Sequence, residues 1–272
     1  MKIWKKLKFW EVKLDKTYDT QSKSVNFNSR LGYIMVAAGA AIGLGNIWKF
    51  PYLAYGGGGG AFVFVYLIVA FIFGHAVVEM ETTIGRFAKT NAVDAYGVIN
   101  KKWKIIGVIN VICTFMIDTY YLIVSGYVLH YAYFYLIGGD FGSDSQVYYS
   151  TFISNPVKPL IFSGILAITL ILILAGGITG LVEKISKYIM PLLFILLVTC
   201  GLWSLFTIEG AFNGLKFYLI PDFSKFTWKT FADVCMQVMF SVGIGWGIYS
   251  TLGATLSDEA NIRKDSIIIT CL

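Results

Sequence analysis

The stretch SRLGYIMVAAGAAIGLGNIWKFPYLAYGGGGG, residues 29–60, decides the fold of this chain. It is long and apolar enough to cross a bilayer, which takes about 20 helical residues. Its middle, Gly43-Leu44-Gly45-Asn46, favours helix poorly and contains a polar amide. A helix that breaks inside a membrane must find partners for its freed backbone groups. Such groups can hold an ion or a small zwitterion halfway across the bilayer.

The composition is that of an integral membrane protein. Of the 272 residues, 57% are hydrophobic and 14% charged, and the mean hydropathy is +0.68. Soluble domains carry about 25% charged residues. The net charge of +6 reflects cytoplasmic loops, so no nucleic-acid partner is expected. The four cysteines lie in separate apolar stretches, which supports neither a zinc site nor a disulfide framework.

Apolar runs predict six membrane spans, at about residues 31–53, 61–84, 105–137, 159–175, 189–208 and 231–256. The segment before the first span and the loop after the second are rich in Lys and Arg, and such loops face the cytoplasm. We therefore expect a cytoplasmic segment over residues 1–29, either interfacial or disordered, and a single transmembrane domain over residues 30–272. A short loop with Glu183, Lys184 and Lys187 should precede the fifth span.

The last residues begin a seventh apolar run, from Ser266 to Leu272. As helix, these residues rise only about 10 Å, too little to cross a bilayer. The sequence therefore predicts the N-terminal part of a longer protein.

The sixth span contains a second irregular segment, Phe240–Gly247, with glycines at three alternate positions. Alone, these glycines are equally explained by close helix packing. However, two glycine-interrupted spans separated by four uninterrupted ones fit an inverted five-helix repeat, in which the first and sixth helices are equivalent. Such a pair indicates the midplane site of a transporter. Asn46 and Ser241 supply oxygens that suit sodium, and the start of a half-helix suits a carboxylate.

Two motifs resemble the first two spans of the neurotransmitter:sodium symporters, the LeuT-fold carriers. They are GAAIGLGNIWKFPYLAYGGGGGAF, residues 39–62, and ETTIGRF, residues 81–87. The pairs Tyr120-Tyr121 and Phe240-Ser241 also match. The resemblance implies an all-α polytopic membrane protein with the LeuT-type inverted-repeat fold. This chain would hold the first five-helix repeat, the sixth helix and the start of the seventh.

The resemblance also implies roles for individual residues. One sodium ion would bind to the carbonyls of Gly39 and Ile42, and another to the Ala41 carbonyl and the side chains of Asn46 and Ser241. The substrate carboxylate would meet the Leu44 and Gly45 amides and the Tyr121 hydroxyl. The implied substrate site comprises Ala40, Ala41, Leu44, Gly45, Ile117, Tyr121, Phe240, Ser241, Gly243 and Trp246.

Chloride, where it is used, would bind to Tyr66, Gln237 and Ser241. Lys49 and Gln237 would form the outer gate, although the family usually has arginine at position 49, whose bidentate fork lysine lacks. At the inner gate the family's tryptophan and arginine are replaced by Phe27 and Ser24.

Among the acids within the predicted spans, Glu81 and Asp118 carry specific expectations, since an ionisable group there is usually functional. We expect Glu81 to accept backbone N–H groups freed by the break in the sixth span, unless it lies close enough to the interface to be hydrated. Asp118 stands where a small apolar residue is expected. It belongs either to a polar network or proton path, or is a poorly tolerated feature.

Gly43 determines the expected substrate class. Monoamine carriers of the family have an aspartate here, so Gly43 predicts an amino acid as substrate. Trp246 would shrink the pocket and Gly243 would enlarge it, which leaves the amino acid open but favours a small or medium apolar one.

The sequence thus predicts sodium-coupled amino-acid symport by alternating access across the plasma membrane. The alternatives are a truncated or split half-carrier that cannot transport alone, a non-transporting membrane subunit, and a channel. Besides lipid, the expected partners are the missing C-terminal spans or a second copy. No Ser/His/Asp or Cys/His arrangement suggests an enzyme.

Overall fold

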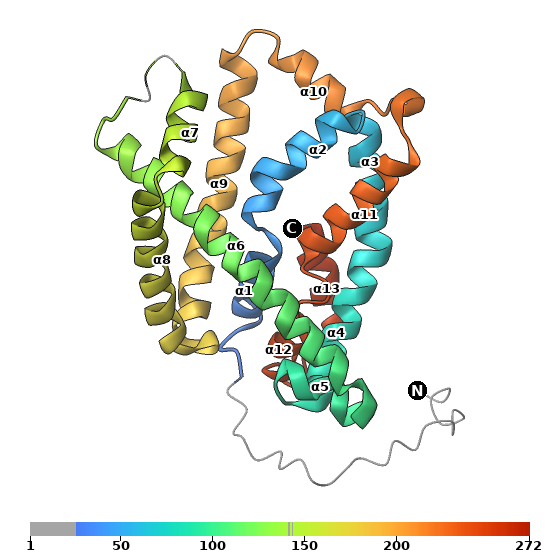
Figure 1. Ribbon diagram of the computed structural model, residues 1–272. Helices are drawn as coiled ribbons and strands as arrows, with labels where there is room; N and C mark the ends of the chain where they lie inside the picture. Colours follow the sequence, from blue (N-terminus) through green and yellow to red (C-terminus); the bar gives the residue numbers. More distant parts are fainter. Residues whose placement is uncertain (1–25, 141, 143) are drawn as a thin grey trace.

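The computed structural model describes residues 26–140, 142 and 144–272. Residues 1–25 of the predicted cytoplasmic segment, Ser24 among them, lie outside the described residues. Within them, the regular elements are helices, and one isolated bridge joins Gly59 to Pro221. Figure 1 shows α6 (Lys104–Leu136) crossing the front of the molecule obliquely.

The first span is broken, as its sequence predicts. Helix α1 (Arg30–Ala41) is followed by a π-helical turn, η2 (Gly45–Lys49), and by α2 (Phe50–Gly56). The two halves are bent by 54°. Helix α1 begins at a capping residue, because the Ser29 hydroxyl accepts a hydrogen bond from the Gly32 backbone nitrogen.

Four continuous segments are long and apolar enough to cross a membrane, and the bent first span makes up to five among the described residues. They comprise Gly60–Ala88 (α3 Gly60–Val69, η3 Ala70–Gly74, α4 His75–Ala88), Lys101–Leu136 (η4 Lys101–Trp103, α6), Val157–Ala175 (α8) and Gly177–Thr207 (η5 Gly177–Val182, α9 Glu183–Thr207).

The predicted sixth span differs from the others. It forms α11 (Trp228–Val242) and α12 (Ile248–Ala254), joined by the five-residue break Gly243–Gly247. This pair is not among the described segments that pass as a span on length and apolarity. The break leaves each half too short to pass alone, so the predicted sixth span is present as two half-helices.

Several predicted loops are partly helical. Short helices α5 (Ala92–Ile99), α7 (Ser145–Ser154) and α10 (Ala211–Leu219) lie in them, as does the 3-10 turn η6 (Phe223–Lys225). Hydropathy does not detect such helices, since they do not cross the membrane. The loop predicted around Glu183 was wrong, because its charged residues lie in the first turns of α9. The last helix, α13 (Ile262–Cys271), begins before Ser266 because Asn261 caps it.

The packing brings the two broken spans together. Helix α12 packs on α4, α13 packs on α4 and α1, and α11 packs on α3. Helix α1 also packs on α9, while α6 packs on α8 and α5. The buried core lies between α1, α3, α4, α11 and α12 and includes Tyr33, Phe62, Val78, Val238 and Tyr249. Helices α8 and α9 expose most of their apolar side chains, as expected of membrane-facing helices.

Candidate functional site

A chain of hydrogen bonds joins the two broken spans. The Asn46 amide nitrogen donates to the Ala41 carbonyl at 3.1 Å. The Ser241 hydroxyl, from α11, donates to the Asn46 amide oxygen at 2.6 Å. Gln237, one turn before Ser241, donates to the same hydroxyl at 3.4 Å. Three oxygens expected to share one sodium ion, on Ala41, Asn46 and Ser241, are therefore linked in one chain.

The break in the first span also frees backbone carbonyls. The Gly43 nitrogen donates to the Ala41 carbonyl at 3.1 Å, and so the Gly39 carbonyl lacks its usual helical partner four residues later. Ile42 and Asn46 line a cavity of about 360 Å³, whose other walls include Met190 and Phe194 of α9. Gly39 also faces α9, because a Cβ there would lie 3.2 Å from the Met190 sulfur.

The donor set around Asn46 fits a sodium ion in kind. A carbonyl, an amide and a hydroxyl oxygen are uncharged, hard ligands of the type that small hard cations prefer. Backbone carbonyls at an unwound span are also how transporters hold sodium at the membrane midplane. Ala41, Asn46 and Ser241 would hold the ion, which would neutralise the negative ends of these dipoles and bind the two spans together.

Tyr121 of α6 lies against the first break. Its hydroxyl accepts a hydrogen bond of 3.2 Å from the Gly45 nitrogen, so it already contacts an amide expected to bind the substrate carboxylate. A Cβ on Gly43 would come within 3.2 Å of the same hydroxyl, so a larger residue there would displace it. Leu44 immediately precedes this amide, at the start of the second half of the span.

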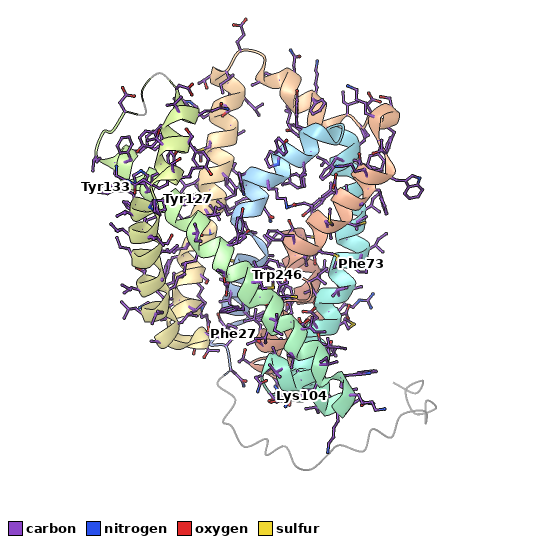
Figure 2. The ribbon with its side chains drawn as sticks, in the orientation of Figure 1. Phe27, Phe73, Lys104, Tyr127, Tyr133 and Trp246 are labelled. Carbon is purple, nitrogen blue, oxygen red and sulfur yellow. The ribbon has the colours of Figure 1, made fainter. Side chains whose placement is uncertain are left out.

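Aromatic rings connect Tyr121 to the second break. The ring centroids of Tyr121 and Phe240 are 5.9 Å apart, and those of Phe240 and Trp246 are 5.2 Å apart. Figure 2 labels Trp246 near the middle of the molecule, beside α6. Ala40, in the last turn of α1, and Ile117, one turn before Tyr121, are both partly buried.

The second break is held open by glycine. Gly243, Gly245 and Gly247 have φ of +73°, +77° and +71°, a conformation that other residues rarely adopt. The Glu81 carboxylate of α4 accepts a hydrogen bond of 2.9 Å from the Gly245 nitrogen. This is the contact that the sequence predicts for Glu81. Its side chain is buried, so the alternative of a hydrated interfacial residue is wrong.

Two residues of α6 that sequence reasoning missed also hold this break. The Thr114 hydroxyl donates to the Trp246 carbonyl at 2.7 Å. The Asn110 amide nitrogen, when turned toward the break, donates to the Gly245 carbonyl oxygen at 2.9 Å. Asn110 also contacts Tyr96 of α5, and burial together with the nearby Glu81 carboxylate raises the pKa of Tyr96. A polar side chain inside an apolar helix was the available signal.

The predicted outer gate shows one contact. The Lys49 ammonium lies 5.4 Å from the centre of the Phe240 ring, a cation–π distance. Among the residues that the structure describes, no hydrogen bond or ion pair joins Lys49 to Gln237. The residues expected to bind chloride are close together, because the side chains of both Tyr66 and Gln237 contact the Ser241 hydroxyl.

At the N-terminal end of α1, a buried carboxylate holds the residues that lead into the helix. Glu183 of α9 accepts hydrogen bonds from the Asn28 backbone nitrogen at 3.0 Å and from the Ser29 hydroxyl at 3.4 Å. It also pairs with Lys187 at 2.7 Å. A Cβ on Gly32 would overlap the Glu183 carboxylate. Sequence reasoning assigned Glu183 to a loop and missed this role.

Phe27 was expected at the inner gate. Its ring packs edge-on against Tyr33, with centroids 5.4 Å apart, and its nitrogen donates to the Thr255 carbonyl at 3.4 Å. Nearby, Arg30 forms a 2.7 Å ion pair with the buried Asp265 of α13. These contacts join the start of α1 to the segment that follows α12.

Comparison with known proteins decides the family. The pattern of the Sodium:neurotransmitter symporter family matches residues 24–138 and 155–272. The chain belongs to this family. Its members are transporters, not enzymes, and the family is sodium-dependent.

Three relatives illustrate the match. An uncharacterized sodium-dependent transporter of Haemophilus influenzae is 36% identical over 258 residues, 89% of this chain and 56% of that protein. A sodium- and chloride-dependent taurine transporter of Bos taurus is 25% identical over 90% of this chain and 46% of that protein. The crystal structure of MhsT in complex with L-phenylalanine matches with a TM-score of 0.82 and 33% identity, over 90% of this chain and 57% of that one.

These findings confirm the predicted fold class and family. The chain is a multi-pass membrane protein with the LeuT-type fold, and small substrates and membrane lipids are partners of the family. It spans about half the length of the relatives that it matches.

Proposed function

We propose that the protein containing this chain is a sodium-coupled symporter of an amino acid. It would work by alternating access, with sodium and substrate held where the first and sixth spans are broken. The observation that carries this proposal is the hydrogen-bond chain from the Ala41 carbonyl through Asn46 to Ser241, since it gathers uncharged oxygens from both breaks.

Sodium would drive transport by linking the two broken spans. Each charge moved down a potential of 100 mV provides about 2.3 kcal/mol. The Gly39 and Ile42 carbonyls form the proposed second sodium site, and the freed Gly39 carbonyl supports it. An ion at Asn46 would lie close to the Gly45 amide, so it would also attract the substrate carboxylate.

The amino-acid class follows from the first break. Gly45 and the Tyr121 hydroxyl offer hydrogen-bonding groups for a carboxylate next to a half-helix N-terminus. Gly43 carries no carboxylate that would repel it. Tyr121 and Phe240 would cover the bound substrate, and Lys49 above Phe240 would hold this cover closed from outside.

We further propose that residues 1–29 form a cytoplasmic segment, that residues 30–272 form part of one transporter domain, and that the protein lies in the plasma membrane. The Lys and Arg bias of the loops supports this orientation. Chloride at Tyr66, Gln237 and Ser241 is part of the same proposal, because the side chains of Tyr66 and Gln237 both contact the Ser241 hydroxyl.

Uptake into proteoliposomes tests the proposal. The protein is expressed from its complete gene, purified and reconstituted, and labelled amino acids are supplied with an inward sodium gradient. We expect uptake with sodium outside and little with potassium or choline in its place. Replacing chloride by gluconate tests the anion separately. Uptake that is indifferent to sodium would contradict the symport mechanism, and sodium-driven uptake of a substrate without a carboxylate would contradict the amino-acid class.

A further inference from the structure

Asp118 is an unpaired acid near the middle of α6. The helix runs from Lys104 to Leu136 within a segment that qualifies as a membrane span. The Asp118 side chain is exposed, and no hydrogen bond or ion pair is formed by it within the described part of the chain. An ionised carboxylate at this depth is costly unless a positive charge or a water-filled cavity accompanies it.

Asp118 lies on the face of α6 that holds the two breaks. Asn110, Thr114 and Asp118 follow one another at intervals of four residues, which places them along one side of a helix. At 100° per residue, Asp118 is about 40° from Thr114 and about 60° from Tyr121 around the helix axis. Thr114 contacts the break in the sixth span through Trp246, and Tyr121 contacts the break in the first.

Along α6, Asp118 therefore lies between two residues, Thr114 and Tyr121, that contact the breaks bordering the proposed substrate site. Aromatic rings also border this site, because Tyr121, Phe240 and Trp246 are in ring contact. A carboxylate beside aromatic faces suits an organic cation, which is attracted by both. Sodium is better served by the uncharged oxygens gathered at Asn46 and Ser241.

We propose that Asp118 selects a substrate with a positively charged side chain, so that the transported amino acid is a basic one. The inference rests on the proposed function: the α-carboxylate would bind at Gly45 and Tyr121, and the side-chain ammonium or guanidinium would reach Asp118. The expectation of an apolar amino acid rests on Gly243 and Trp246 alone. A basic substrate gives the acid at position 118 a partner, whereas no hydrogen bond within the described residues joins it to a polar network or proton path.

Paired probes test this inference in the reconstituted protein. Labelled L-lysine and L-norleucine differ by the terminal ammonium, and their sodium-dependent uptake gives a preference ratio. We expect the unmodified protein to prefer lysine, and Asp118→Asn to lower the ratio roughly tenfold, as for loss of one partner of a partly desolvated charge pair. Asp140→Asn is the matched control, because it removes a carboxylate from the loop after α6. It should leave the ratio unchanged.

The possible failures are distinguishable. Sodium-dependent uptake of norleucine without uptake of lysine would overturn the role of Asp118 and leave the proposed function intact. An unchanged ratio in Asp118→Asn would do the same. Absence of sodium-dependent uptake for every amino acid would overturn both. If Asp118→Asn does not fold, competition of unlabelled lysine against labelled norleucine in the unmodified protein decides, and a lack of competition contradicts the inference.

Discussion

The Glu81 carboxylate accepts a hydrogen bond of 2.9 Å from the backbone nitrogen of Gly245, which lies 164 residues further along the chain. The bond satisfies an N–H group that the break in the sixth span leaves without a helical partner. It ties that break to α4, while Thr114 ties the following carbonyl to α6. The broken span is therefore a fixed structure with its own partners, not a frayed helix.

Replacing Glu81 by Ala should destabilise the protein by about 1–3 kcal/mol, because the Gly245 nitrogen would be left unsatisfied. Glu81→Gln retains a carbonyl oxygen that can accept the bond, so its cost should be smaller. The free energy of unfolding in mixed detergent micelles measures both. Glu259→Ala, in an exposed loop, is the control and should change little. Equal losses for Ala and Gln would show that the charge matters and the hydrogen bond does not.

Alanine substitutions at the glycines of the sixth-span break should differ in how much they destabilise the protein, according to the backbone conformation and the space around each new Cβ. Gly245→Ala meets no atom within 4 Å but must keep φ near +77°, at a cost of about 1–2 kcal/mol. Gly247→Ala has a similar φ and also places its Cβ 2.9 Å from that of Ala92, which adds about 1–3 kcal/mol. Gly201→Ala, inside α9 with open space, should be neutral or stabilising. The free energies of unfolding in micelles give this order. A Gly247→Ala protein as stable as the unmodified one would contradict it.

Much of the site was predictable from short-range signals. Gly43, Asn46 and the glycines of the sixth span weaken helix locally, so both breaks could be located from the sequence. The contact of Glu81 with the second break was also predictable, since a buried acid in a span needs a donor.

The rest depended on contacts between distant parts of the chain. The partner of Thr114 is 132 residues away, and no local pattern identifies it. Glu183 looked like a loop residue because it sits among charges, whereas its burial depends on Gly32 and Asn28, which lie on α1 or just before it. Short helices such as α5 were missed because hydropathy detects spans only.

Tyr121→Phe should weaken substrate binding roughly tenfold, because the Gly45 nitrogen loses its hydroxyl partner and the substrate carboxylate loses a donor. The dissociation constant of a labelled amino acid in saturating sodium measures this effect. Tyr120→Phe is the matched control, since Tyr120 is adjacent in sequence but exposed. Equal weakening by both substitutions would place the carboxylate elsewhere.

Ser241→Ala should raise the sodium concentration needed for half-maximal uptake roughly threefold to tenfold, as expected for loss of one oxygen contact. The Ser241 hydroxyl is bonded to Asn46 at 2.6 Å, so its removal also frees the amide that should face the ion. In the control Ser204→Ala, the lost hydroxyl bonds, within the described part of the chain, only to the Cys200 carbonyl of its own helix. An unchanged sodium dependence in Ser241→Ala would exclude this hydroxyl as a ligand.

Glu183 should be coupled energetically to Asn28, because its carboxylate accepts hydrogen bonds from both the Asn28 backbone and side chain, at 3.0 Å and 3.2 Å. Glu183→Ala and Asn28→Ala, made singly and together, form a double-mutant cycle on the free energy of unfolding, in which Asn28→Ala removes the side-chain donor and leaves the backbone donor in place. We expect a coupling of about 1–3 kcal/mol, as for a hydrogen bond to a charged group. The same cycle with Lys184→Ala, whose side chain is exposed on α9, should give none. If Asn28 coupled equally to both positions, α1 would be held to α9 by general packing and not by this carboxylate.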